Sequence, residues 1–241
     1  MEIKPLTPHI GAEIRGVDLS GPLSNEEFSA IHQAHLDWMV LVFRDQHLDR
    51  EQHKAFGRRF GKLHVHPMNK LRSGDQEVLI VKTDKDSKYT AGNGWHTDVT
   101  CDEYPPMGSM LYITETPECG GGDTMYADMY LAYELLSDTM KDMLEGLTAV
   151  HDGALPYVGA YNAPLARRSG SIHATSIRSS PGTPETGKRL LYVNSGVHLS
   201  HKRAVGQGIS RDAEPVVRAH RTDAAAYLSR RVGAEYAHVL G

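Results

Sequence analysis

The sequence predicts a mostly β fold in which helices decorate a β-sandwich core. Several short apolar or alternating segments, such as residues 77–82, have the length and composition of strands. Long polar or glycine-rich stretches separate these segments, as expected of excursions between strands. At 241 residues, of which 40% are hydrophobic, the chain can bury a sizeable core and does not require two domains. We therefore expect a single domain over residues 1–241.

The N-terminal segment is expected to form a strand, a capped helix and a second strand. Residues 10–19 alternate apolar and polar side chains and end in turn-forming residues, which is typical of a strand. Ser24 and Glu27 match a capping box. In this motif the two residues are three positions apart, and each side chain accepts a hydrogen bond from the backbone N–H of the other residue. The apolar run 41–43 after this helix predicts a buried strand.

A second helix is expected to start at residue 48 and to end near Gly57 or Gly61, because glycine commonly follows the last helical residue. Residues 77–82 then predict a strand. The polar residues 83–94 that follow it predict a mobile loop.

Strands are also expected at residues 107–113 and 124–127, on either side of a glycine-rich turn at 120–122. Residues 130–147 place apolar side chains close to the 3.6-residue period of an amphipathic helix. Beyond this helix, a stretch rich in Gly, Ser, Pro and Arg without periodicity predicts a long loop. The last two predicted elements are this loop at 157–184 and a strand at 190–193.

Composition and charge exclude several classes of protein. The net charge of -4 provides no basic excess for binding nucleic acid. No apolar run is long enough to cross a bilayer, and the N-terminus lacks the apolar stretch of a signal peptide, so we expect a cytoplasmic protein without a membrane partner. Because the only cysteines are Cys101 and Cys119, a disulfide framework is not expected. A metal would have to bind to carboxylates and to some of the 14 histidines.

The strongest local signal for chemistry is the motif Trp-His-Thr-Asp-Val-Thr at residues 95–100. In a strand, side chains two residues apart project from the same face, so His96 and Asp98 are predicted to bind one cation together. One imidazole, one carboxylate and a distant second imidazole would form the facial triad that leaves positions open on Fe(II). The bare His-x-Asp pattern is common, and its alternative interpretation is a strand-edge histidine beside a turn-capping aspartate.

The same motif is one of several sequence blocks that follow one another along most of the chain. They are Gly-Ala-Glu-Ile at 11–14, Gly-Val-Asp-Leu at 16–19, Val-Phe-Arg-Asp-Gln at 42–46, Phe-Gly-Lys-Leu-His-Val-His-Pro at 60–67, Trp-His-Thr-Asp-Val-Thr at 95–100 and Gly-Gly-Asp-Thr at 121–124. In order and spacing, these blocks resemble the taurine dioxygenase (TauD/TfdA) family of Fe(II)- and 2-oxoglutarate-dependent dioxygenases. The resemblance implies a double-stranded β-helix, or jelly roll, with the metal between its two sheets.

The resemblance also implies roles for individual residues. His96 and Asp98 correspond to the first two iron ligands. Thr124 corresponds to the residue whose hydroxyl helps to hold the distal carboxylate of 2-oxoglutarate, and His66 and Val99 fall where the family lines its primary-substrate pocket. Simpler interpretations are that Thr124 starts a strand, that His66 is a loop histidine and that Val99 is an ordinary strand residue.

The last part of the chain departs from the family pattern. The family's third ligand is a histidine, followed about eleven residues later by an arginine that pairs with 2-oxoglutarate, and His220 with Arg231 has this spacing. However, residues 224–236 resemble the family's segment that precedes this histidine, so that both groups would lie beyond Gly241. On that interpretation, which we favour, the chain is truncated and lacks its last strands.

The implied activity is hydroxylation of a small organic substrate with O2 and 2-oxoglutarate, releasing succinate and CO2. An anionic substrate such as a sulfonate is one candidate. An alternative is a catalytically inactive jelly-roll fragment or a small-molecule-binding module. A zinc hydrolase is disfavoured, because no paired general base accompanies His96 and Asp98. Unpaired sheet edges in a truncated chain would favour self-association, so a homo-oligomer is one of the expected states.

Overall fold

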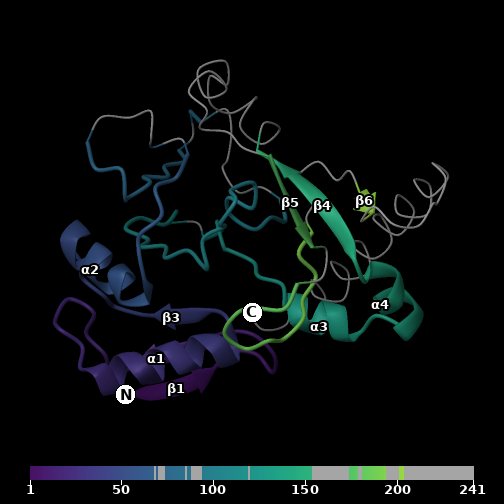
Figure 1. Cartoon of the computed structure of the whole chain (residues 1–241). Helices are drawn as coiled ribbons and strands as arrows, with labels where there is room; N and C mark the ends of the chain where they lie inside the picture. The colour runs from purple at the N-terminus through teal and green to yellow at the C-terminus, as the bar shows by residue number, and fades with distance from the viewer. Residues whose placement is uncertain are drawn as a thin grey trace. The chain divides into compact units, whose positions relative to one another are not determined.

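The structure is a computed structural model, and most of what it describes lies in the first 153 residues. The described residues are 1–67, 69, 74–84, 86–87, 94–118, 120–153, 174–178, 181–193 and 201–203. All of them lie in the first of the two units into which the chain divides, Met1–Arg203, and Figure 1 shows their helices and strands. Among these residues, every helix is shorter or more polar than a bilayer-spanning helix would need to be.

A small mixed sheet lies near the N-terminus. Its strands are β1 (Glu2–Pro5), β2 (Ala12–Arg15) and β3 (Leu41–Phe43). The strand order is β1-β2-β3, with β1 antiparallel and β3 parallel to β2. Because side chains alternate along a strand, Ala12 and Ile14 both reach the buried face of β2. Both strands predicted in this part of the chain are confirmed, although the first is shorter than expected.

Helix α1 (Asn25–Trp38) connects the parallel strands β2 and β3. The predicted capping box is present at its start: Ser24 Oγ accepts a hydrogen bond from Glu27 N at 3.1 Å, and Glu27 Oε2 accepts one from Ser24 N at 2.9 Å. These bonds satisfy backbone donors that have no partner within the helix. The helix ends at Met39, whose φ of 62° redirects the chain into β3.

Helix α2 (Arg50–Phe60) packs against α1 and contributes to the N-terminal core. It starts with a second capping box, between Asp49 and Gln52, and ends at Gly61, one of the two glycines predicted. The rings of Phe28 and Phe60 meet edge to face, with centroids 4.9 Å apart. The core cluster consists of Leu19, Ile31 and Phe56, surrounded by Val17, Leu23, Phe28, Leu41, Phe43, Leu48 and Phe60.

A second three-stranded sheet has β4 in its centre, with both neighbours antiparallel to it. Its strands are β4 (Leu147–Asp152), β5 (Ala174–Arg178) and β6 (His201–Arg203), and it follows helices α3 (Met129–Glu134) and α4 (Asp138–Leu144). The single helix predicted over 130–147 is wrong, because Ser137 accepts a hydrogen bond from Met140 N and caps a new helix. The loop predicted over 157–184 is wrong at β5, which pairs with β4.

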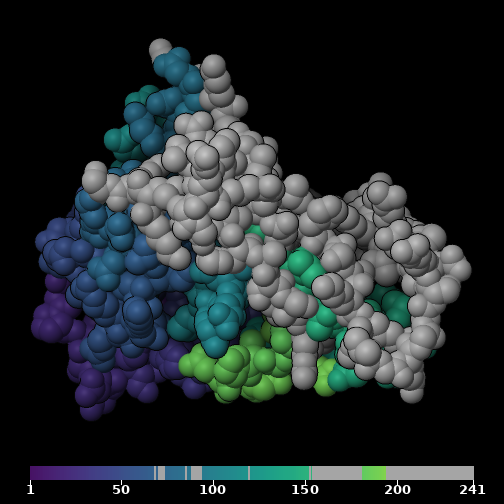
Figure 2. Space-filling model, turned by 45° about the horizontal axis from the view of Figure 1, so that its top comes forward, coloured from purple at the N-terminus to yellow at the C-terminus, as the bar shows by residue number. Residues whose placement is uncertain are grey.

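Four other predicted strands are not strands in the structure: residues 77–82, 107–113, 124–127 and 190–193. Many of their apolar side chains are exposed, including Ile80, Leu111 and Met125. A strand requires a neighbour for its backbone N–H and C=O groups, and a local apolar pattern cannot specify that neighbour. Residues 181–193, green in Figure 2, instead form part of the molecular surface. The described strands form two separate sheets, and the jelly roll stays a prediction.

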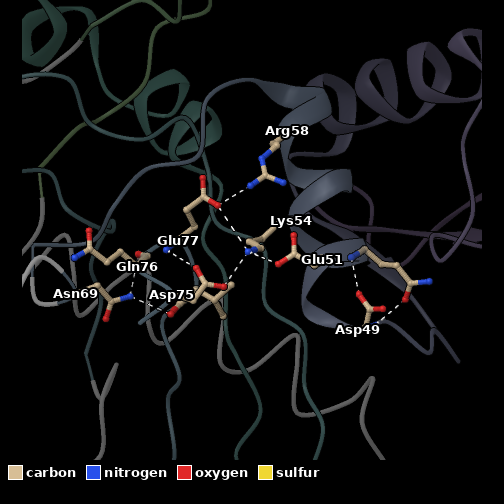
Figure 3. Close-up of polar contacts among 10 residues, drawn as sticks. Asp49, Glu51, Lys54, Arg58, Asn69, Asp75, Gln76 and Glu77 are labelled. Atoms are coloured by element: carbon tan, nitrogen blue, oxygen red, sulfur yellow. Dashed lines mark hydrogen bonds and ion pairs between the residues drawn. The ribbon is translucent and has the colours of Figure 1, made fainter. Parts of the chain in front are cut away.

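A cluster of charged side chains joins helix α2 to Asp75 and Glu77 (Figure 3). Lys54, only 9% exposed, has its Nζ 2.9 Å from Asp75 and 3.9 Å from Glu77. It also contacts Glu51 of its own helix at 2.6 Å, and Arg58 donates to Glu77 at 2.6 Å. Because Lys54 is nearly buried among three acids, losing its charge would leave those acids repelling one another.

The side chain of Asn69 holds the same segment by bonding to the segment's backbone. Its buried side-chain amide donates to the carbonyl oxygens of Gln76 and Val78, at 3.2 and 3.0 Å. Backbone and side-chain bonds together therefore attach residues 75–78 to the rest of the fold.

We expect Lys54→Met to lower the free energy of unfolding and to increase hydrogen exchange in residues 75–78. Methionine preserves the buried aliphatic stem, so the change isolates the charge. The matched control is Lys82→Met, because the Lys82 side chain is 76% exposed and forms an ion pair with an exposed residue, Asp84, at 3.4 Å. Urea unfolding and hydrogen–deuterium exchange measure both effects. Equal responses of the two variants would show that the cluster does not anchor this segment.

Candidate metal-binding site

His96 and Asp98 lie in a turn rather than in a strand. The backbone is irregular at residues 96–97 and forms a turn at 98–101. The strand that was predicted to bring the two side chains together is therefore wrong. The two side chains do face each other, with His96 Nε2 3.3 Å from Asp98 Oδ1. Each side chain is about half exposed, which leaves the pair accessible to a ligand from solvent.

The ring of His96 is oriented by its other nitrogen. Nδ1 lies 2.8 Å from the carbonyl oxygen of Gly94. Because a carbonyl oxygen can only accept, Nδ1 carries a hydrogen, and Nε2 is the nitrogen left for Asp98 or for a metal. The hydrogen bond to Asp98, followed by that to Gly94, raises the pKa of His96 to about 9. In the metal-free protein at neutral pH, His96 is therefore an imidazolium paired with a carboxylate.

Asp98 is oriented in the same way, through its second oxygen. Ser109 Oγ donates to Asp98 Oδ2 at 2.6 Å, so that Oδ1 faces His96. The hydrogen bond with His96 lowers the pKa of Asp98, burial opposes this effect, and the bond from Ser109 lowers the pKa further. The carboxylate is therefore ionised at neutral pH and can act as a metal ligand.

The segment that carries Ser109 is attached to the N-terminal part of the fold through Tyr112. Tyr112 Oη donates to the carbonyl oxygen of Gln46 and accepts from the backbone N–H of Leu48, both at 3.1 Å. Ser109 was not predicted as a site residue, and it lies in the segment 107–113 that was predicted to be a strand. A lone serine eleven positions after an aspartate carries no recognisable signal, so only the folded chain identifies it.

The geometry suits a cation held by both side chains. Two ligand atoms at about 2.1 Å from a common ion, and at about 90° to each other, lie about 3.0 Å apart. The 3.3 Å between His96 Nε2 and Asp98 Oδ1 is close to this separation, and a bound cation would replace the proton between them. The second polar atom of each side chain already has a partner, which is the usual way in which proteins orient metal ligands.

Val99 lies in the turn in an unfavourable backbone conformation. Its φ is 49°, in the left-handed region, which costs a β-branched residue about 1–3 kcal/mol. Its side chain is 8% exposed, and Thr100 and Cys101 after it are also buried. The interpretation of Val99 as an ordinary strand residue is therefore wrong. Its role in a substrate pocket stays a prediction.

Two other predicted site residues can be located relative to Asp98. His66 is half-buried, and its charge contributes to the lowered pKa of Asp98. Thr124 is exposed, two residues before Tyr126. The pKa of Tyr126 is raised first by burial and then by the negative charge of Asp98, so this part of the chain lies within electrostatic range of the site. The roles of His66 and Thr124 in binding substrate and 2-oxoglutarate stay predictions.

The described part of the chain contains two of the residues predicted as ligands, His96 and Asp98. Within it, no group of three or more His, Cys, Asp or Glu side chains is arranged to hold a metal ion. The candidates for the third ligand and for the arginine, His220 and Arg231, lie outside the described residues. Cys101 is buried.

Comparisons with known sequences identify the family. The family model described as "Taurine catabolism dioxygenase TauD, TfdA family" matches residues 2–230. An alkylsulfatase from Acinetobacter baylyi is 37% identical over 163 residues, which cover 66% of this chain and 49% of that protein. An alpha-ketoglutarate-dependent sulfonate dioxygenase from Saccharomyces cerevisiae is 31% identical over 217 residues, which cover 80% of this chain and 49% of that protein. This chain thus spans about half the length of these two relatives.

A solved structure agrees with the sequence comparisons. The crystal structure of a taurine dioxygenase from Burkholderia xenovorans has a TM-score of 0.67 with this structure and 33% sequence identity. The similarity covers 92% of this chain and 73% of that chain. The resemblance inferred from the sequence blocks is confirmed, because the family model matches residues 2–230. The chain belongs to the TauD/TfdA family of taurine catabolism dioxygenases.

Proposed function

We propose that the chain is an Fe(II)- and 2-oxoglutarate-dependent dioxygenase that oxidises a small organic substrate with O2. The observation that carries this proposal is the contact of His96 Nε2 with Asp98 Oδ1 at 3.3 Å, with each side chain oriented through its other polar atom. Membership of the TauD/TfdA family supports the choice of iron and 2-oxoglutarate. Similarity to a solved taurine dioxygenase supports a jelly roll as the complete fold.

In this proposal, the protein binds and orients reactants and performs little acid–base chemistry. His96 and Asp98 would hold the metal, and the bonds with Gly94 and Ser109 orient these two side chains. When bound, iron and 2-oxoglutarate supply the oxidising chemistry with O2. His96 releases its Nε2 proton to solvent as the metal binds, because the imidazole must be neutral to coordinate.

Other residues are proposed to bind the organic cosubstrate. The exposed Thr124 would donate its hydroxyl hydrogen to a carboxylate of 2-oxoglutarate. The family pattern requires a third metal ligand and an arginine for the same carboxylate group, and His220 with Arg231 is the pair with suitable spacing. Testing these two residues separately would decide whether the chain itself completes the triad.

We further propose that the substrate is an organic sulfonate or sulfate ester. Support comes from the relatives named as an alkylsulfatase and a sulfonate dioxygenase. His66 and Val99 are the residues proposed to line the pocket, and a histidine N–H can donate to an anionic oxygen. Hydroxylation of the carbon next to the heteroatom would release the sulfur-containing group.

Anaerobic titration tests the proposed metal centre. Fe(II) and 2-oxoglutarate together should give the wild-type protein the weak visible charge-transfer absorption of a chelated complex. Asp98→Asn should lose this absorption and weaken Fe(II) binding by about tenfold or more, because it removes a charged ligand. Asp84→Asn, which changes an exposed carboxylate, should retain both properties. A folded wild-type protein without the absorption would overturn the proposal in favour of an inactive fragment or a binding module.

Removing the hydroxyl of Ser109 should weaken the site without removing a ligand. We expect Ser109→Ala to lower the affinity for Co(II) by about tenfold, because Asp98 Oδ2 loses its orienting donor. Isothermal titration calorimetry measures the affinity. Ser87→Ala is the matched control, since its hydroxyl bonds Asp84 in a different part of the chain. Equal Co(II) affinities in the two variants would contradict a role for Ser109.

Metal binding should depend on pH between 7 and 9. The raised pKa of His96 means that its ion pair with Asp98 stabilises the metal-free protein fully below pH 6.5 and that this contribution disappears as the pH rises through about 9. Bound Co(II) displaces the same proton, so its apparent affinity should rise by about tenfold per pH unit below pH 9. In Asp98→Asn the dependence should move toward pH 6.5, the ordinary value. A wild-type affinity independent of pH would contradict this assignment.

A further inference from the structure

We infer that His64 and Asp102 form a positioning pair that holds the two metal ligands in place, an inference that rests on the proposed function. His64 Nε2 lies 2.6 Å from Asp102 Oδ2, although the two residues are 38 positions apart in the chain. Neither is a ligand in the proposed site. Their contact instead joins the segments that carry the site residues, 63–67 and 94–102.

Asp102 is bonded to the turn as well as to His64. Its backbone N–H donates to the carbonyl oxygen of Val99 at 3.1 Å and so closes a turn over residues 99–102, directly after Asp98. Val99 has a φ of 49°, and a residue in such a conformation stays there only when its surroundings hold it. The Asp102 side chain is bonded to His64, which is remote in the chain. The pair therefore restrains the turn that contains Val99 from outside.

The pair is better shielded from water than the metal ligands. The side chains of His64 and Asp102 are 27% and 13% exposed, whereas those of His96 and Asp98 are about half exposed. Water therefore competes less for the contact between His64 and Asp102 than for that between His96 and Asp98. Asp102 Oδ1 is buried and has no hydrogen-bond partner in the described part of the structure, so the carboxylate depends on its other oxygen and His64.

The same pair also restricts His66. His66 follows His64 by two residues in a short irregular segment, so fixing one limits the position of the other. The charge of His66 already acts on Asp98. The positioning pair therefore connects the metal ligands with a residue proposed to line the substrate pocket. Loss of the pair should disturb metal binding even though both ligands remain.

Calorimetric titration with Co(II) tests the inference on the full chain. Asp102→Asn preserves the shape of the side chain and removes its charge, and it should weaken Co(II) binding by about tenfold. His64→Ala should have a similar effect, and the double variant should bind no more weakly than the weaker single variant, since the two residues act as a unit. His32→Ala is the matched control and should bind like the wild type, because it breaks a different contact, 3.0 Å from His32 Nε2 to Glu185.

The outcomes separate this inference from the proposed function. If the wild type does not bind Co(II), or if Asp98→Asn binds it equally well, the proposed metal site is wrong. If the wild type binds and Asp102→Asn matches His32→Ala, the positioning role is wrong. Titrations are made below the unfolding transition of each variant, so a loss of stability alone does not alter the measured affinity. Should His64→Ala fail to fold, the result for Asp102→Asn decides.

Discussion

The candidate metal site depends on a tight turn in which a valine takes a left-handed backbone conformation. Val99, with φ at 49°, separates Asp98 from the buried Thr100 and Cys101. Such a conformation is unfavourable for a β-branched residue, and the burial of the next two side chains adds to the restraint that the His64–Asp102 pair is proposed to supply. The chain therefore turns directly after His96 and Asp98, whose side chains face each other with Nε2 3.3 Å from Oδ1.

Helix α2 contacts two segments that support the site. A Cβ at Gly57 would lie only 2.9 Å from Leu63, so the bare glycine allows this close packing, and Met110 lies at an ordinary contact distance, 3.9 Å from the same position. Leu63 precedes the positioning histidine His64, and Met110 follows Ser109, which bonds Asp98. A well-packed N-terminal core therefore stabilises loops that have little regular structure of their own.

The ion pair in the metal-free protein prepares the site for a cation. His96 and Asp98 already face each other, and each has its second polar atom bonded elsewhere. In the proposed site, exchange of one proton for one metal ion would need little rearrangement, so less binding energy would be lost in ordering the ligands. This property agrees with membership of a family of metal-dependent oxygenases.

The features that depend on nearby residues were predictable from sequence. The capping box of Ser24 and Glu27, the end of α2 at Gly61 and the His96–Asp98 motif all involve residues close together in the chain. The strand predicted for this motif was wrong, since its side chains come together at a turn. Family resemblance added the chemistry that the bare motif could not specify.

Tertiary structure alone decided which distant segments meet. The bonds from Ser109 to Asp98 and between His64 and Asp102 span 11 and 38 positions, and no local sequence pattern predicts either bond. The same limit explains the predicted strands that did not form, such as residues 107–113. Local sequence sets a residue's conformational preference, whereas a hydrogen-bond partner far along the chain depends on how the whole chain packs.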